Sequence, residues 1–272
     1  MKDTLKKNDP IGVFDSGIGG LSILKVAQSK LPNQTWIYVA DEAFLPYGDK
    51  SSEDVRNRAQ VITDFFLSKN VKAILIACNT ATAAAIDFLR KKHQEMLFIG
   101  VEPAVKPAAN ITNTKVIGIL ATGSTTESNR LIKLVERFSK EIKVIIQPCP
   151  GIVELIETGD YKSYSAKKLI ESYLEPMLTQ KADVIALGCT HYFFLTQIIQ
   201  QIVGKSVLLL DTSEPVITEL QHQLSINDLI SKTSTQKPEF WTTKNLNVKR
   251  HNFERAWGEP IEINYLGVKK SD

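Results

Sequence analysis

Residues 73–80 read AILIACNT, and residues 184–191 read VIALGCTH. Each segment is an apolar run that ends in a cysteine and small polar residues, which is typical of a buried strand and the loop after it. A second pair of similar segments is IGVFDSG at 11–17 and IGILATG at 117–123. The two pairs are offset by 111 and 106 residues, so the sequence predicts two similar halves, each with one strand-end cysteine.

Strand-like and helix-like segments alternate along most of the chain. Strands are expected near residues 11–14, 36–40, 73–77, 116–120, 144–147, 184–187 and 207–210, and helices near 21–31, 55–66, 81–89 and 169–177. Ser51 is the predicted N-cap of the second helix. Strands separated by helices form parallel sheets from βαβ units. We therefore expect an α/β fold with two pseudo-symmetric α/β domains, mostly parallel sheets, and the active site in the cleft between them.

The length of 272 residues is enough for two domains of this kind. We expect residues 1–102 together with 208–272 to form the first α/β domain, the latter segment being a C-terminal return. Residues 103–207 are expected to form the second domain. The polar stretch 231–238 is interpreted as a linker to a small terminal element.

Composition excludes several classes of protein. Hydrophobic residues make up 43% and charged residues 23% of the chain, as in ordinary globular proteins. Lys and Arg number 33 against 30 Asp and Glu, a balance that argues against nucleic acid or a membrane as a partner. Three cysteines without a CxxC pair make a disulfide framework or a zinc ribbon improbable. The charged start MKDTLKKNDP lacks an apolar secretion segment, so a cytoplasmic protein is expected.

Four loops at the expected strand ends carry small polar or thiol groups: residues 15–17, 78–80, 122–125 and 189–191. Ligands of open α/β sheets bind at the carboxyl ends of strands. Each loop is also expected to open a helix, whose free N–H groups favour an anion such as a carboxylate. The alternative is that these residues only cap helices, and the two roles are compatible.

The cysteines differ in their expected roles. Cys78 and Cys189 stand at strand-to-helix junctions, where a helix N-terminus lowers the pKa of a thiol toward neutrality. Cys149 precedes a proline and is interpreted as a small buried hydrophobic residue.

No signature of a cofactor or metal is present. The segment ending in Gly204-Lys205-Ser206 has Ile199 where a P-loop requires glycine, and Ser22 stands at the third glycine position of a dinucleotide fingerprint. Cys189 and His191 lie two residues apart, but no spaced ligand set completes a metal site. We expect neither a cofactor nor a metal.

These motifs resemble those of the glutamate racemases, cofactor-independent members of the aspartate/glutamate racemase superfamily. The resemblance runs in order along nearly the whole chain: DSGIGGL at 15–21, VAD at 39–41, PYG at 46–48, ACNTA at 77–81, PA at 103–104, AT at 121–122 with Thr125, GCTHY at 188–192, FWTT at 240–243 and GEP at 258–260. His191 favours glutamate, because aspartate racemases usually carry Glu after Cys-Thr. The departures are Phe193 in place of a usual Pro, Leu131 where Tyr is common, and TGST in the threonine loop.

The resemblance implies racemisation of L-glutamate to D-glutamate by two cysteines, one on each face of the substrate. Cys78 would serve the D-enantiomer with help from Asp15, and Cys189 would serve the L-enantiomer with help from His191. Glu157 aligns with a family acid near the site; the alternative for it is a solvated helix face. The remaining polar groups would bind glutamate together with Asp15 and His191: Ser16, Tyr47, Gly48, Asn79, Thr80, Thr122, Thr125 and Thr190. The implied role is supply of D-glutamate for bacterial peptidoglycan, and hence for cell shape, by a homodimer.

Three other functions remain open at this point. The nearest is a racemase for a related acidic or cyclic substrate, such as aspartate or a hydantoin. A second is a one-cysteine carbon–carbon lyase of the arylmalonate decarboxylase type, which the two matched cysteines disfavour. A third is a binding protein without catalysis.

Overall fold

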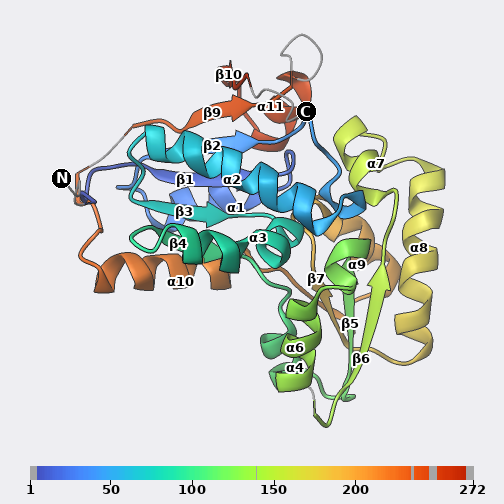
Figure 1. Cartoon of the computed structure of the whole chain (residues 1–272). Coiled ribbons are helices and arrows are strands. Elements are labelled where there is room, and N and C mark those ends of the chain that lie inside the picture. Colours follow the sequence, from blue (N-terminus) through green and yellow to red (C-terminus); the bar gives the residue numbers. More distant parts are fainter. Residues whose placement is uncertain (1–4, 139, 234–235, 245–249, 268–272) are drawn as a thin grey trace.

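The strands form two parallel sheets in the computed structural model, which describes residues 5–138, 140–233, 236–244 and 250–267 (Figure 1). The first sheet has the order β10-β9-β2-β1-β3-β4, and the second has the order β6-β5-β7-β8. The strands are β1 Ile11–Asp15, β2 Trp36–Ala40, β3 Ala73–Ile76, β4 Leu97–Gly100, β5 Val116–Ala121, β6 Lys143–Pro148, β7 Val184–Leu187, β8 Leu208–Leu210, β9 Glu239–Thr242 and β10 Ile263–Tyr265.

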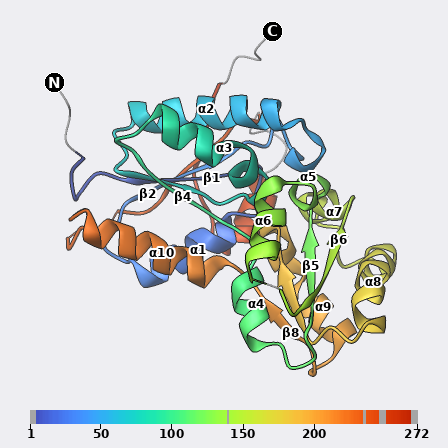
Figure 2. The same cartoon turned by 60° about the horizontal axis from the view of Figure 1, so that its bottom comes forward.

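Helices cover both faces of the first sheet (Figure 2). Helices α2 (Ser52–Ser68) and α3 (Asn79–Lys92) pack together on one face, and α1 (Leu21–Lys30) and α10 (Ser213–Ile226) pack together on the other. Helix α2 begins after Ser51, whose hydroxyl accepts the N–H of Asp54 at 3.1 Å. Helix α11 (Arg250–Trp257) packs against α1.

The second sheet is likewise enclosed by helices. Helices α4 (Val105–Ile111) and α6 (Asn129–Phe138) lie together, while α8 (Tyr164–Thr179) packs against α9 (Thr196–Val203) (Figure 2). The short elements are η1 Tyr47–Asp49, α5 Gly123–Thr126, α7 Ile152–Thr158 and η2 Thr190–Leu195. The 3-10 helix η2 directly follows Cys189, so this cysteine does not open an α-helix as expected.

The predicted α/β fold with two parallel-sheet units is confirmed. The expected strands at 36–40 and 184–187 have the observed bounds, and the other five differ by a few residues at their ends. The alternation did not predict β4, β9 or β10. The latter two are short strands at one edge of the first sheet, paired in parallel with each other and with β2.

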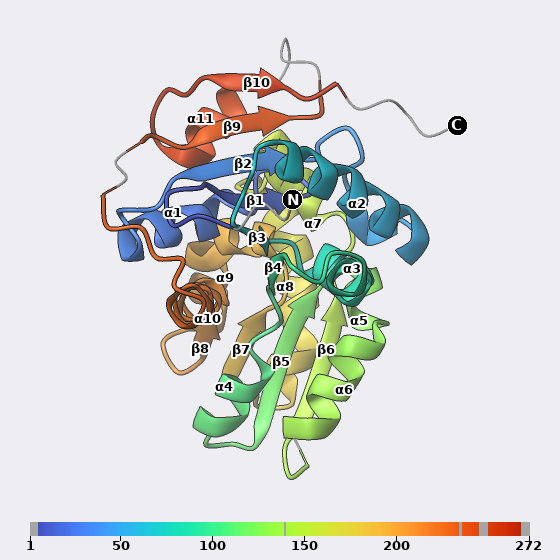
Figure 3. The ribbon, with the colours of Figure 1, turned by 60° about the vertical axis from the view of Figure 1, so that its left-hand side comes forward.

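The chain passes between the two sheets after β4 and again after β8 (Figure 3). Strand β8 pairs with β7 in the second sheet, whereas α10 packs against the first. The division into 1–102 with 208–272 and 103–207 stays a prediction; residues 208–210 pair with the second sheet. Of the expected linker, residues 234–235 lie outside the described part of the chain.

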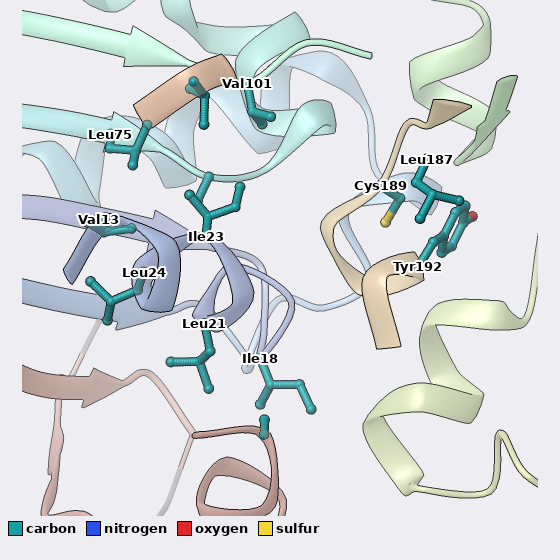
Figure 4. Packing of buried hydrophobic residues seen from close by; sticks show 14 of the residues in the cluster. Val13, Ile18, Leu21, Ile23, Leu24, Leu75, Val101, Leu187, Cys189 and Tyr192 are labelled. Atoms are coloured by element: carbon teal, nitrogen blue, oxygen red, sulfur yellow. The ribbon is translucent and has the colours of Figure 1, made fainter. Parts of the chain in front are cut away.

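A continuous apolar core joins the halves near the carboxyl ends of the strands. Val13 and Leu75 from the first sheet belong to the same buried cluster as Leu187 and Tyr192 from the second. Figure 4 shows this cluster, with the side chain of Cys189 beside Leu187 and Tyr192. No helix in the described residues is long and apolar enough to cross a membrane.

Candidate active site

Cys78 and Cys189 follow β3 and β7, which occupy corresponding positions, since β3 pairs with β1 in the first sheet and β7 pairs with β5 in the second. Both are buried, with 5% and 9% of the residue surface exposed. They are close enough that negative charge on Cys189 raises the pKa of Cys78. The structure therefore brings the two repeat-related thiols into one buried site, and neither forms a disulfide.

The Cys78 thiol is the N-cap of α3, as its position in the sequence indicates. Its Sγ accepts the N–H of Ala81 at 3.4 Å. Burial nevertheless raises the pKa of the Cys78 thiol well above its ordinary value, and the nearby Asp15 raises it further. The expected lowering of the Cys78 pKa by the helix N-terminus is wrong, because desolvation of the thiolate exceeds the stabilisation from Ala81 and Ser16.

Asp15 is anchored at the end of β1 by the loop that follows it. Its Oδ2 accepts the N–H groups of Gly17 at 3.2 Å and Gly20 at 3.0 Å, and its Oδ1 accepts the Thr190 hydroxyl at 3.2 Å. Burial raises the pKa of Asp15 above its ordinary value, although His191 and the two N–H groups oppose that rise. A carboxyl group with a raised pKa is suited to acid–base work beside Cys78.

His191 connects Cys189 to Glu157. Its Nδ1 lies 4.0 Å from the Cys189 Sγ, and its Nε2 lies 2.8 Å from Oε1 of Glu157. Burial alone would lower the pKa of His191, but hydrogen bonds with Cys189 and Glu157 and the charge of Asp15 raise it well above its ordinary value. Cys189, His191 and Glu157 therefore form a continuous buried chain of polar contacts.

Glu157 lies in this site and is 2% exposed, so the alternative of a solvated helix face is excluded. Helix α7 carries it, and its Oε1 also accepts the N–H of Ile18 at 2.9 Å. The 15–21 loop needs glycine at positions 17 and 19, where it approaches Glu157 and His191 closely. A Cβ at Gly17 would lie 2.1 Å from Oε1 of Glu157, and one at Gly19 would lie 2.6 Å from Nδ1 of His191.

Three threonine hydroxyls form a second cluster. The Oγ1 of Thr80 lies 2.9 Å from that of Thr122 and 3.2 Å from that of Thr125, and the latter two are 2.9 Å apart. Thr80 belongs to α3 over the first sheet, whereas the other two follow β5 of the second sheet. The hydroxyls therefore join the two halves at this point.

Asn79 and Ser16 are also buried beside Cys78. Asn79 is 4% exposed, and neither polar atom of its side chain has a hydrogen-bond partner among the described residues. Leaving buried amide atoms unpaired is costly, which makes Asn79 a candidate to bind a polar ligand. Ser16 contributes a hydrogen bond that lowers the pKa of Cys78.

The phenol of Tyr47 is committed to another residue. It donates to Oδ2 of Asp41 at 2.6 Å, while Arg58 forms a buried two-pronged pair with the same carboxylate. Thr243, from the segment after β9, donates to Oδ1 of Asp41 at 2.8 Å. Gly48 lies against the second half, since its carbonyl accepts the Ser124 hydroxyl.

We did not predict from the sequence that Arg58 and Thr243 hold the Asp41 carboxylate to which Tyr47 is hydrogen-bonded. The available signal was a charged side chain on the apolar face of α2, next to Ala59 and one turn after Val55. Arginine is almost never fully buried unless it is paired with an acid, and Asp41 in the VAD motif was the candidate for its partner.

Cys149 is also buried, but it lies beside Tyr192 instead of with Asp15 or Glu157. The Tyr192 hydroxyl donates to the Cys149 carbonyl at 3.3 Å, and burial raises the pKa of Cys149 to about 12.

Among the described residues, no group of three or more His, Cys, Asp or Glu side chains is arranged to hold a metal ion.

Comparison with known proteins gives consistent results. The family model described as Asp/Glu/Hydantoin racemase matches residues 22–219. The glutamate racemase of Ectopseudomonas mendocina is 41% identical over 254 residues, which cover 93% of this chain and 97% of that protein.

Solved structures agree with this match. A glutamate racemase isoform from Bacillus anthracis aligns with a TM-score of 0.87 at 28% identity, covering 96% of this chain and 98% of the other. The glutamate racemase of Francisella tularensis, solved in complex with D-glutamate, aligns with a TM-score of 0.85 at 32% identity and the same coverage.

Proposed function

This chain belongs to the Asp/Glu/Hydantoin racemase family, and from that premise we propose that it interconverts L- and D-glutamate with two cysteines as acid and base. The observation that carries the proposal is the pairing of Cys78 and Cys189 at equivalent strand ends, buried in one site. Each thiol has its own titratable partner, Asp15 for Cys78 and His191 with Glu157 for Cys189.

The proposed reaction removes one proton from Cα of glutamate and returns one proton to the opposite face of the same carbon. A thiolate on one face takes the α-proton of glutamate, and the electron pair left on Cα takes a proton from the thiol on the opposite face. Cys78 acts on the D-enantiomer and Cys189 on the L-enantiomer, and the states of the two sulfurs are exchanged after each turnover. Positioned acid–base groups and hydrogen-bond donors stabilise the carbanion-like transition state.

The substrate itself assists ionisation of Cys78. Burial disfavours the Cys78 thiolate. The ammonium group of glutamate brings a positive charge into the buried site, and a cation at close range lowers the pKa of a thiol. Thiolate formation is thus coupled to binding of an amino acid.

Polar groups around the thiols bind the two carboxylates and the ammonium group. Asn79 is the strongest of these candidates, because its buried amide has no partner among the described residues. We assign substrate binding to Asp15, Ser16, Tyr47, Gly48, Asn79, Thr80, Thr122, Thr125, Thr190 and His191. Since the Tyr47 phenol is bonded to Asp41, the backbone of Tyr47 and Gly48 is the part that we propose to serve here.

The proposal extends to the cell. We infer supply of D-glutamate for peptidoglycan, a cytoplasmic location, and a homodimer that needs neither nucleic acid nor a membrane as a partner. We also keep the division into domains at residues 102/103 and 207/208 as part of this proposal, with the substrate held between the domains.

Circular dichroism of the purified protein with L- or D-glutamate tests the proposal. Optical activity should decay to zero from either enantiomer without added cofactor. Prior dialysis against a chelator and hydroxylamine, which removes metals and pyridoxal phosphate, should leave the rate unchanged, whereas thiol alkylation should abolish it. Loss of activity on chelation alone would refute the two-thiol mechanism.

The same assay separates the alternatives. Faster racemisation of aspartate or a hydantoin than of glutamate would replace the proposed substrate. Tight binding of glutamate without exchange of its α-hydrogen would indicate a binding protein.

A further inference from the structure

A charged pocket lies where α2 and α3 of the first half approach α5 and α6 of the second half. Figure 3 shows α3 above α5 and α6 at this place. The pocket has a volume of about 740 Å³. Five cationic side chains line it against three carboxylates: Lys50, Arg56, Arg130, Lys133 and Arg137 against Asp87, Glu102 and Glu127.

Two of the three carboxylates pair with the same arginine, Arg130. The Nε of Arg130 lies 2.5 Å from Glu102, and its Nη1 lies 3.2 Å from Asp87. None of the other four cations forms an ion pair with a described residue. Five cations against three carboxylates leave the pocket with a surplus of two positive charges, which is available to a soluble anion.

The pocket adjoins the site that contains the two thiols. Thr80 lines it, and the Thr80 hydroxyl contacts Thr122 and Thr125 in the threonine cluster. Ser124 lines it as well, and donates to the carbonyl of Gly48 across the junction of the two halves. Thr80 therefore belongs both to the wall of the pocket and to the threonine cluster, and it lies two residues after Cys78.

We propose that this pocket is an entrance vestibule that attracts the anionic substrate and raises its concentration beside the closed site. The proposal rests on the proposed function, because glutamate at neutral pH carries two carboxylates and one ammonium group. Charges that line a concave surface act over distances comparable to the Debye length, which is roughly 30 Å at 0.01 M and 8 Å at 0.15 M salt. The cations of the vestibule thus favour binding without contacting the reacting atoms.

Charge reversal on α6 tests the vestibule. Lys133 and Arg137 are exposed, lie one turn apart, and belong to no part of the catalytic or binding machinery. In the double variant Lys133→Glu/Arg137→Glu, kcat/KM for both enantiomers should fall about three- to tenfold at ~10 mM ionic strength. The loss should appear in KM, with kcat unchanged, and should shrink to less than about twofold in ~0.5 M NaCl. The neutral variant Lys133→Gln/Arg137→Gln should lie between it and wild type.

The matched control is Lys167→Glu/Lys205→Glu, which makes the same change in net charge on exposed lysines of α8 and the α9–β8 turn. Its kcat/KM should stay within about 1.5-fold of wild type under both salt conditions. An equal loss in the control, a loss that salt does not relieve, or a fall in kcat would each overturn the vestibule. If wild type racemises glutamate and the α6 double variant has the same kcat/KM, the vestibule is overturned but the proposed function is not. Absence of glutamate turnover in wild type would overturn the proposed function and the vestibule with it.

Discussion

The imidazole Nε2 of His191 lies 2.8 Å from Oε1 of Glu157, and the same oxygen accepts the backbone N–H of Ile18. Glu157 and His191 come from the half with the second sheet, whereas Ile18 comes from the loop after β1 of the first sheet. One carboxylate therefore adds to the hydrogen bond from Cys189 in raising the pKa of His191, and it ties together the two loops that flank the site.

Replacing Glu157 by glutamine should lower kcat/KM roughly ten- to a hundredfold, since a hydrogen bond to a charged group contributes ~1.5–3 kcal/mol. The pKa of His191, which Glu157 helps to raise, should fall, so the alkaline limb of the pH profile should move to lower pH. A pH series of initial rates measures both effects. The control Glu154→Gln, at an exposed position of the same helix, should behave as wild type, and an unmoved alkaline limb in Glu157→Gln would contradict the assigned role.

Single replacement of either thiol by serine should abolish full racemisation, because a hydroxyl is a far poorer base than a thiolate near neutral pH. Elimination from a β-halogenated or N-hydroxy glutamate analogue needs only one face. Cys189→Ser should keep this reaction with the D-analogue, and Cys78→Ser with the L-analogue. Cys149→Ser should resemble wild type in every assay.

Deuterium incorporation tests the two-base geometry in the unmodified protein. At early times in deuterated buffer, the label should appear at Cα mainly in the product enantiomer, since a different acid protonates each face. Equal early labelling of recovered substrate would require one rapidly exchanging base and would eliminate the two-cysteine mechanism.

Replacing Asn79 by leucine should separate stability from function. Both polar atoms of its side chain are buried without a partner among the described residues, so an apolar side chain of similar size removes an unfavourable burial. We expect the free energy of unfolding to stay equal or to rise by about 1 kcal/mol, while kcat/KM falls at least roughly tenfold. Urea unfolding and initial rates measure the two quantities. A destabilised variant with normal kinetics would reduce Asn79 to a structural residue.

Breaking the buried pair of Asp41 and Arg58 should destabilise the fold. Arg58→Met leaves the Asp41 carboxylate buried with only the hydroxyls of Tyr47 and Thr243, and loss of one partner of a buried pair costs roughly 3–5 kcal/mol. The variant Arg56→Met, two residues away and without an ion pair to a described residue, should change the free energy of unfolding by less than about 0.5 kcal/mol. Equal effects in the two variants would contradict the prediction.

Stability should rise with pH through Lys72. Its side chain is buried before β3, where the ammonium group donates to Gln34 at 2.6 Å and to the carbonyl of Lys7. Burial lowers the pKa of Lys72 from 10.5 to about 8. Between these two values the unfolded chain binds more protons than the folded protein, so the free energy of unfolding increases with pH.

The size of this effect is at most about 2 kcal/mol between pH 7.5 and 9.5, since one pKa unit is worth ~1.4 kcal/mol. Urea unfolding of wild type and Lys72→Met at both pH values isolates it, because Met does not titrate. Identical pH dependence in the two proteins would show that Lys72 does not contribute.

The sequence by itself determined the α/β alternation and the pair of strand-end cysteines. Strands buried on both faces must be continuous apolar runs, and helices on a sheet must have one apolar face, so both patterns are local and visible in the chain. Segments 73–80 and 184–191 are two such runs in equivalent places, which is why the relation between Cys78 and Cys189 was evident before the fold was known.

Only the tertiary structure decided what surrounds the thiols. Glu157 meets Ile18 across 139 residues, and the phenol of Tyr47 is bonded to Asp41 instead of facing outward. The pKa of Cys78 is raised, whereas the sequence predicted that it would be lowered. Desolvation depends on how many atoms from both halves enclose the sulfur, whereas the helix N-terminus is a local feature of the sequence. The edge strand β10 is likewise set by pairing with β9, which its three residues could not reveal alone.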